Sequence, residues 1–418
     1  MRAWCFYDCA NSAFATTVTA AVLPPYFADV AAATVPRHVA TATWAYGSAA
    51  ALLLAAIAGP LLGATADRLG RRKRLLLGCV AVGAVATAAI AATPAGDWRA
   101  MIALFGVAFI AFACGNVLYD SLLPAVADPG ELHRVSARGF AYGYLGGGIL
   151  LAINLAWILF PRSFGLSGAD AAIRLSFVSV ALWWLGFSIP LARSLHEPRS
   201  PGVALPAHRL ARDVLVGLGR TLGGLRRRPE LLQFLIAFWL YSDGIGTIVK
   251  MATVYGREVG IGRTHLIGAL LLVQILAAPA SLWFGRLAGP LGPQRAVFIG
   301  LMGYVGITVL GFFLSTPLHF WLLAVLVALF QGGTQALSRS MFAALVPRAK
   351  LGELFGFYSV SEKLAGVLGP LMFGLVAQAS GASRYAVLTL MPFFILGGWL
   401  LMRVDLAAGA RRAEAEGS

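Results

Sequence analysis

Long apolar segments, separated by short polar or basic stretches, recur along nearly the whole chain. An α-helix needs about 20 apolar residues to cross the hydrocarbon core of a bilayer. By this criterion the sequence predicts twelve membrane-spanning helices, at roughly 4–28, 42–66, 75–93, 100–127, 138–160, 172–194, 231–256, 264–288, 296–315, 319–346, 353–380 and 384–402. We therefore expect an all-α integral membrane protein.

The pattern also repeats between the two halves of the chain. The motifs at 122–124 (Leu-Leu-Pro) and 130–132 (Gly-Glu-Leu) recur at 345–347 (Leu-Val-Pro) and 352–354 (Gly-Glu-Leu). Repeated halves are a recurring plan in membrane transporters. We expect two six-helix pseudo-repeat bundles, which occupy 1–194 and 231–403.

The segments outside these bundles are more polar. Residues 195–230 form a long cytoplasmic linker, in which 207–228 place leucines on one side and arginines around them. This pattern favours a basic amphipathic helix on the membrane surface, although three glycines leave a flexible linker as the alternative. The Ala-rich, charged tail 404–418 is expected to be disordered.

The charge balance indicates the orientation of the chain. The formal net charge is +15, yet only 12% of residues are charged, against about 25% in soluble proteins. With both termini in the cytoplasm, most of the 33 Lys and Arg residues lie in inner loops and tails. Outer loops hold Arg37, Arg99, Arg162, Arg174, Arg257, Arg263 and Arg384. This asymmetry follows the positive-inside rule, so we expect anionic inner-leaflet lipid as the partner of the charge and no nucleic acid.

The cysteines and the first residues add little chemistry. Cys5, Cys9, Cys79 and Cys114 all lie in apolar segments without a C-x-x-C spacing, so we infer no disulfide, no metal site and no cofactor. Asp8 and Asn11 interrupt the first apolar stretch, which is therefore expected to be a retained helix and not a cleaved signal.

Polar residues inside the predicted helices are the candidates for chemistry, because a charge in the bilayer costs about 2.5–3.5 kcal/mol on insertion scales. They recur at helical spacing on helices 1, 4, 7 and 10, which suggests one shared wet cavity. The substrate or coupling candidates are Asp8, Asn11, Asn116, Tyr119, Asp243, Thr247, Lys250, Gln331, Gln335, Glu362 and Lys363. A packing role is the alternative for each.

Depth in the membrane separates their expected roles. Asp8, Asp120 and Arg339 lie near the cytoplasmic ends of their helices, where we expect inner-gate ion pairs. Asp243 and Glu362 lie nearer mid-membrane, so they are the candidates for substrate contact or proton coupling. Either lysine, Lys250 or Lys363, could be the neighbouring cation.

A basic stretch between the second and third segments carries the first family resemblance. Its signature residues are Gly63, Asp67, Arg68, Gly70, Arg71 and Arg72. The spacing resembles the helix 2–3 loop of the major facilitator superfamily of secondary transporters; an ordinary basic turn is the alternative. We expect Asp67 to accept hydrogen bonds from cations or from a helix start across the two halves, as a latch of the outward-facing state. Gly289 replaces this acid in the second half, so a second latch should be weak or absent.

Further motifs resemble one branch of that superfamily. They are 7–14 (YDCANSAF), 24–27 (PPYF), 143–148 (GYLGGG), 331–340 (QGGTQALSRS) and 355–360 (FGFYSV). They resemble the vacuole-effluxer-like proteins, named for a fungal autophagy-related protein linked to amino-acid release. The resemblance implies twelve helices and export or exchange of a small solute. Cys9 and Glu362 depart from the pattern. The Ala- and Arg-rich composition favours a bacterial plasma membrane.

Three functions remain open on the sequence. The first is a secondary active transporter that moves a small polar solute, with amino-acid efflux or exchange favoured and protons as a candidate coupling ion. The second is a transporter-like scaffold or sensor without transport. The third, a membrane-embedded enzyme, is disfavoured because every histidine falls in a loop or at a helix edge, so no nucleophile–base pair suggests itself.

Overall fold

The computed structural model describes residues 1–35, 37–194, 216, 219–220 and 223–416, and these residues form helices joined by short turns without a strand. The amino-terminal half contains α1 (Arg2–Ala13), η1 (Phe14–Val22), α2 (Leu23–Tyr26), η2 (Phe27–Ala31), α3 (Arg37–Leu69), α4 (Arg72–Ala91), α5 (Trp98–Ser121), α6 (Leu123–Val126), η3 (Pro129–Glu131), α7 (Leu132–Leu159), η4 (Pro161–Phe164) and α8 (Ala169–Ser194). The carboxy-terminal half contains α10 (Pro229–Glu258), α11 (Arg263–Leu291), α12 (Pro293–Phe312), α13 (Pro317–Leu345), η5 (Arg348–Lys350), α14 (Leu351–Ser380), α15 (Ser383–Leu388), α16 (Met391–Met402) and α17 (Leu406–Ala415).

The predicted all-α membrane architecture is confirmed. Within the described part of the chain, ten helical spans are long and apolar enough to cross a membrane, one of them formed by α15 and α16 together. The continuous helical run of residues 2–31 and the helix α14 stand at the two remaining predicted positions. The twelve predicted segments therefore each correspond to helix in the structure.

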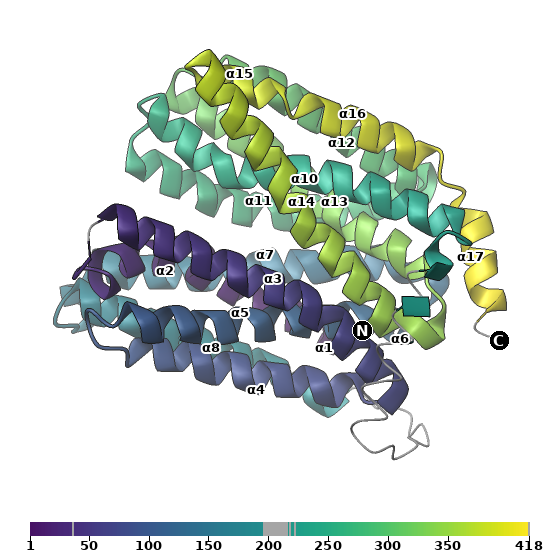
Figure 1. The fold of residues 1–418 in the computed structure, drawn as a ribbon, viewed down its shortest axis with the longest axis horizontal. Coiled ribbons are helices and arrows are strands. Elements are labelled where there is room, and N and C mark those ends of the chain that lie inside the picture. Colours follow the sequence, from purple (N-terminus) through teal and green to yellow (C-terminus); the bar gives the residue numbers. More distant parts are fainter. Residues whose placement is uncertain (36, 195–215, 217–218, 221–222, 417–418) are drawn as a thin grey trace.

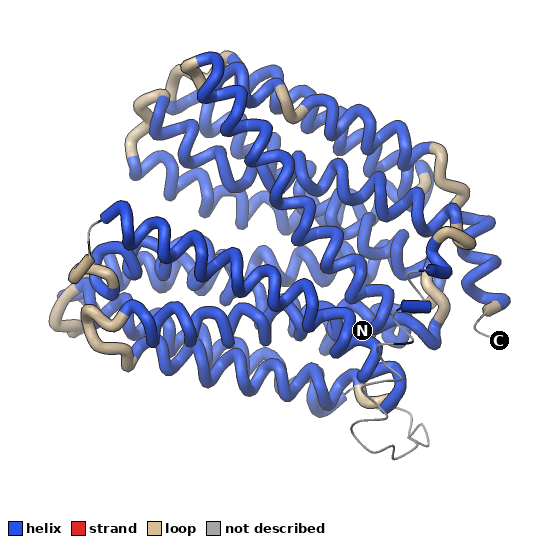
Figure 2. Tube along the Cα trace, viewed as in Figure 1, coloured by secondary structure: helices blue, strands red, loops and turns tan. Residues whose placement is uncertain are grey.

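The helices form two bundles, one from each half of the chain (Figure 1). In the amino-terminal bundle α1 packs on α7 and α8, and α5 packs on α3 and α4. In the carboxy-terminal bundle α10 packs on α14 and α16, and α13 packs on α11 and α12. Two seams join the bundles: α3 against α14, and α7 against α11 and α13. The tube view shows the same division, with loops gathered at the two ends (Figure 2).

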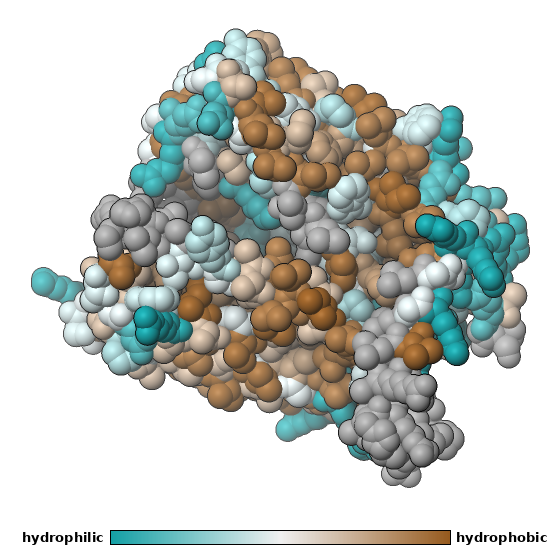
Figure 3. Space-filling view, in the orientation of Figure 1, coloured by the Kyte–Doolittle hydropathy of each residue, from teal (hydrophilic) through white to brown (hydrophobic). Residues whose placement is uncertain are grey.

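The two ends of the molecule differ. We call the end that carries the α3–α4 turn, the start of α14 and α17 the closed end, and the opposite end the open end. The surface is hollowed between the bundles toward the open end (Figure 3). Apolar side chains cover the flanks of both bundles, where exposed residues such as Leu54, Leu182, Ile275 and Leu371 would face lipid.

The first helix is irregular where it passes the hollow. Residues 14–22 and 27–31 are π-helical, and Pro24 lies in the short α2 between them. The Thr16 hydroxyl donates to the carbonyl oxygens of Ser12 at 3.0 Å and of Gly147, on α7, at 3.2 Å. Single π-helical turns are frequent at functional sites, because they re-aim side chains without breaking the helix.

The expectation of a disordered tail was wrong. Residues 406–415 form α17, which begins with the Asp405 side chain accepting from the backbone N–H of Ala408 at 2.9 Å. An ion pair of 3.2 Å joins Arg412 to Glu230 at the start of α10. The helix α17 packs on α13 and α10, with Gly409 and Ala413 buried, and the ion pair adds to this contact. Most of the predicted interfacial helix at 207–228 lies outside the described residues.

Candidate functional site

A cavity of about 340 Å³ lies at the interface of the two bundles. Its polar wall comes mainly from the amino-terminal bundle, where Asp8, Ser12 and Thr16 lie on the first helix and Tyr144 on α7. The carboxy-terminal bundle adds amides and aliphatic side chains: Val249, Leu270, Val273, Gln274, Gln331 and Gln335. A cavity lined by residues of both halves is therefore present, as the shared-cavity prediction requires.

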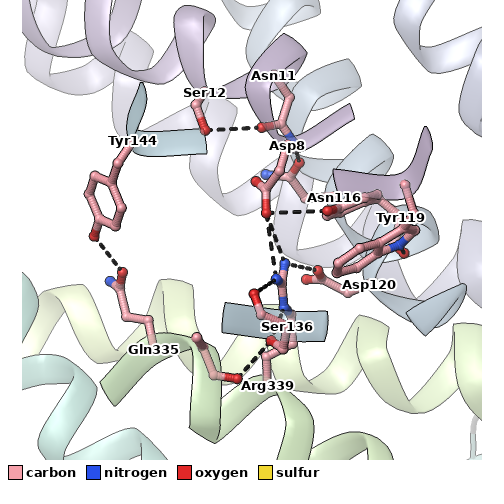
Figure 4. Close-up of polar contacts among 12 residues, drawn as sticks. Asp8, Asn11, Ser12, Asn116, Tyr119, Asp120, Ser136, Tyr144, Gln335 and Arg339 are labelled. Atoms are coloured by element: carbon pink, nitrogen blue, oxygen red, sulfur yellow. Dashed lines mark hydrogen bonds and ion pairs between the residues drawn. The ribbon is translucent and has the colours of Figure 1, made fainter. Parts of the chain in front are cut away.

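Arg339 lies next to this cavity, paired with the lining residue Asp8. Its guanidinium Nη1 lies 3.0 Å from Asp120 Oδ1 and 3.4 Å from Asp8 Oδ2 (Figure 4). The same group donates from Nε to Ser136 Oγ at 2.9 Å and from Nη2 to the Ser136 carbonyl oxygen at 3.0 Å. The structure thus joins the three residues expected as inner-gate ion pairs. One cation from α13 meets two carboxylates of the other bundle, which leaves one formal negative charge in excess.

Aromatic rings of the amino-terminal bundle surround the same guanidinium. Its Cζ lies 4.3 Å from the ring centroid of Phe140, 4.8 Å from Trp4 and 5.6 Å from Tyr119. Rings that face a desolvated cation attract it by about 2 kcal/mol. A Cβ at Gly139 would come within 2.7 Å of Trp4 and 2.9 Å of Arg339 Nη2, so this glycine makes the room.

The remaining stripe residues of helices 1, 4 and 10 lie beside this cluster. Asn11 Nδ2 donates to Asn116 Oδ1 at 2.6 Å, which ties α1 to α5. Tyr119 Oη donates to Asp8 Oδ2 at 3.2 Å. Gln335 Oε1 accepts from the Tyr144 hydroxyl at 3.2 Å across the cavity (Figure 4). These contacts bring together side chains from both bundles, as the shared-cavity interpretation requires.

Asp243 lies apart from the cavity wall. It is 1% exposed, and its Oδ2 accepts from the backbone N–H of Gly369 on α14 at 2.9 Å. Gly369 permits this approach, because a Cβ there would overlap the Thr247 hydroxyl. Pro370 follows directly inside α14. Asp243 and Thr247 therefore hold α10 against α14, and neither lines the central cavity.

The other charged candidates of the carboxy-terminal bundle are Lys250, Glu362 and Lys363. Lys250 is exposed on α10 and is within electrostatic range of Asp243, as their shared helix face predicted. Glu362 is also exposed. The side chain of Lys363 lies outside the side chains that the structure describes. Neither Lys250 nor Glu362 is among the residues that line the central cavity.

The signature loop forms a contact across the closed end. Asp67 Oδ1 and Oδ2 accept from the backbone N–H groups of Gly352 at 3.0 Å and Glu353 at 2.9 Å, at the start of α14. Arg72 lies 2.7 Å from Asp67 and donates to the carbonyl oxygen of Arg348 at 3.1 Å. A carboxylate at a helix amino terminus satisfies orphan N–H groups and the helix dipole. The hydrogen bonds expected of Asp67 are present.

Glycines shape the rest of this loop. A Cβ on Gly63 would overlap the carbonyl oxygen of Gly352, so only glycine allows α3 and α14 to meet backbone to backbone. Gly70 has a φ of 59°, which permits the tight turn into α4. Arg68 and Arg71 are exposed. A Cβ on Gly289 would meet nothing within 4 Å, so the second-half position is not packed as tightly as Gly63 is.

Several residues of the site were missed in the sequence. Trp4 lies one helical turn before Asp8, and Ser136, Phe140 and Tyr144 follow one another at four-residue intervals on α7. The i, i+4 spacing and the glycines between these α7 residues were the available signal. Gln274 on α11 stands alone among apolar residues and gave no such pattern.

Comparison with known proteins agrees with this geometry. The model of the family described as vacuole effluxer Atg22 like matches residues 30–133 and 128–414. An uncharacterized MFS-type transporter of Bacillus subtilis (strain 168), YxiO, is 37% identical over 402 residues, which cover 95% of this chain and 92% of that protein. Autophagy-related protein 22 of Yarrowia lipolytica is 28% identical over 310 residues, covering 67% of this chain and 52% of its own length. The chain therefore spans about half of that relative.

A solved structure shows the shared fold. The proton:xylose symporter XylE bound to 6-bromo-6-deoxy-D-glucose superposes with a TM-score of 0.74, over 96% of this chain and 94% of that chain, at 14% identity. The resemblance predicted from the loop and helix motifs is confirmed. With two six-helix bundles, a cavity at their seam and matches along nearly its whole length, the chain belongs to the vacuole effluxer Atg22-like family of major facilitator superfamily transporters.

Proposed function

We propose that this protein is a secondary active transporter that moves a small polar solute by alternating access, with an amino acid exported or exchanged across a bacterial plasma membrane. Alternating access rocks one bundle against the other around a site at their interface. The cavity-lining residue Asp8 pairs with Arg339, and the surface between the bundles is hollowed toward the open end, so the structure corresponds to an outward-facing state if both termini are cytoplasmic.

The observation that carries this proposal is the composition of the seam. Arg339 on the carboxy-terminal bundle pairs with Asp8 and Asp120 on the other bundle, and Asp8 also lines the cavity. A buried ion pair that loses one partner costs about 3–5 kcal/mol, so the bundles separate at this end only if the charges find new partners. A solute or a proton at Asp8 would supply that compensation and so couple binding to opening.

The cavity suits a solute that has both a charged and an apolar part. Asp8, Ser12 and Thr16 offer oxygen atoms on one wall. The wall from the other bundle carries three aliphatic side chains beside three glutamine amides: Val249, Leu270, Val273, Gln274, Gln331 and Gln335. Val249, Leu270 and Val273 also line an adjoining apolar cavity of about 120 Å³ in the carboxy-terminal bundle. An amino acid fits this division. The fungal relatives are named for autophagy, which supports the proposal without defining the substrate.

Reconstitution tests the proposal directly. Purified protein in proteoliposomes should take up labelled amino acids in a saturable way, and faster when a pH gradient is imposed if protons are coupled. Empty liposomes and an Asp8→Asn variant serve as controls. Failure of every amino acid to accumulate or to exchange against preloaded amino acid would contradict this assignment and favour a scaffold or sensor.

A further inference from the structure

All groups that contact the Arg339 guanidinium in the site described above belong to the amino-terminal bundle. Trp4 and Asp8 lie on α1, Tyr119 and Asp120 on α5, and Ser136 on α7. Phe140, also on α7, completes the set. We call these six residues the cation cage. Arg339, on α13, is the group that enters it from the other bundle.

The cage is held together by contacts that do not involve Arg339. The Trp4 indole N–H donates to the carbonyl oxygen of Tyr119 at 3.0 Å, and the two rings stack at 4.3 Å with 14° between their planes. The Tyr119 hydroxyl donates to Asp8 Oδ2. Because these bonds lie within one bundle, a rigid movement of that bundle preserves them.

From this arrangement we propose that Arg339 occupies, as a tethered cation, a binding site for the guanidinium or ammonium group of an organic cation. This inference rests on the proposed alternating access, which withdraws Arg339 when the closed end opens. The vacated cage presents two carboxylates, Asp8 and Asp120, together with three ring faces. Carboxylates bind guanidinium and ammonium groups through charge-assisted hydrogen bonds, and aromatic ring faces attract the same cations.

The geometry also gives the site a direction. In the outward-facing arrangement Asp8 is shared between the cage and the cavity, so a solute in the cavity can reach one carboxylate only. After Arg339 leaves, the same solute, which first contacted Asp8 alone, could contact all the groups of the cage. Arg339 then competes with the solute, and its return would expel the solute as the closed end re-forms.

Ethylguanidinium and its uncharged, nearly isosteric counterpart ethylurea test this site in purified full-length protein. The Asp67→Asn variant, which weakens the closed-end latch, should gain thermal stability with ethylguanidinium in a saturable way. Wild-type protein should need about tenfold more, because its cage is mostly filled and apparent affinity scales with the vacant fraction. Ethylurea should have no effect.

Further variants separate the cage from general effects. Adding Asp8→Asn to Asp67→Asn should abolish the ethylguanidinium response, whereas adding Asp128→Asn, an exposed acid outside the cage, should leave it. An equal response in all variants, or a response to ethylurea, would overturn the proposal.

The Arg339→Ala variant tests the cage without any movement of the bundles, because the substitution itself removes the guanidinium. If cysteine labelling shows that Asp67→Asn stays closed, alternating access as proposed fails, yet Arg339→Ala should still be stabilised by ethylguanidinium. Absence of stabilisation in Arg339→Ala, or in an Asp67→Asn protein that labelling shows to be open, refutes the cation site itself.

Discussion

At the scale of single residues, the environment of Arg339 decides how much its charge contributes. Its side chain is 5% exposed, and it contacts two carboxylates, a serine and three aromatic rings. A guanidinium can satisfy this set because it is planar and donates in several fixed directions, whereas an ammonium group is a compact point charge. Arginine is therefore not interchangeable with lysine here.

Replacing Arg339 should reveal this dependence. We expect Arg339→Gln to lower stability by about 3–5 kcal/mol, because Asp8 and Asp120 would stay buried without their cation. Arg339→Lys should fall between that variant and wild type. Thermal unfolding in detergent measures both. The control is Arg403→Gln, since Arg403 is exposed and lies 3.8 Å over the Trp399 ring, where the loss should be about 1 kcal/mol at most. Equal losses at the two arginines would argue against a special role for the buried one.

At the scale of elements, α14 is held by two acidic side chains from different bundles. Asp67 of α3 binds the N–H groups at its start, and Asp243 of α10 binds the N–H of Gly369 near its middle, just before Pro370. The first contact crosses the seam and the second lies within one bundle. Loss of the Asp67 contact should free the start of α14, and loss of the Asp243 contact should free its middle.

The Asp67 contact should control access at the closed end. Asp67→Asn weakens two hydrogen bonds and removes the ion pair to Arg72, so the protein should shift toward the inward-open state. We expect faster labelling of a cysteine at Ser340, which is buried at the α7–α13 seam against His133. Asp97→Asn, at the other end of the molecule, is the matched control. Unaltered labelling at position 340 would count against the latch.

The Asp243 contact should affect coupling. Asp243→Asn should abolish gradient-driven accumulation and spare exchange, because the amide keeps the packing against Gly369 but cannot take up a proton at neutral pH. Transport in proteoliposomes with and without a pH gradient separates the two activities. Unchanged accumulation would remove Asp243 from the coupling role.

At the scale of the whole molecule, the two bundles should move as rigid bodies. Spin labels on Ser163, in η4, and Ser315, in the turn after α12, report the distance between the bundles at the open end. This distance should shorten by several ångströms in Asp67→Asn, whereas label pairs within one bundle should keep theirs. Larger changes within a bundle than between bundles would contradict rocking.

The sequence by itself determined the helices. A segment that crosses lipid must satisfy its backbone hydrogen bonds internally, so it forms a helix and its sequence is a long apolar run. It also identified the Asp67 loop and the charged residues of helices 1, 4 and 10, since charges are rare in such runs. The second-half acids and lysines were less predictable. Asp243 proved to bind the backbone of α14, a partner that no spacing along α10 could indicate.

Only the tertiary structure decided which charges meet. Arg339 lies more than 200 positions from both Asp8 and Asp120, and the aromatic residues that enclose it are apolar positions like many others in the chain. The sequence of the tail, too, predicts disorder, because its pairing of Arg412 with Glu230 depends on a residue of the distant α10. Local apolar pattern specifies a membrane helix, but burial and pairing of a charge depend on neighbours supplied by the other bundle.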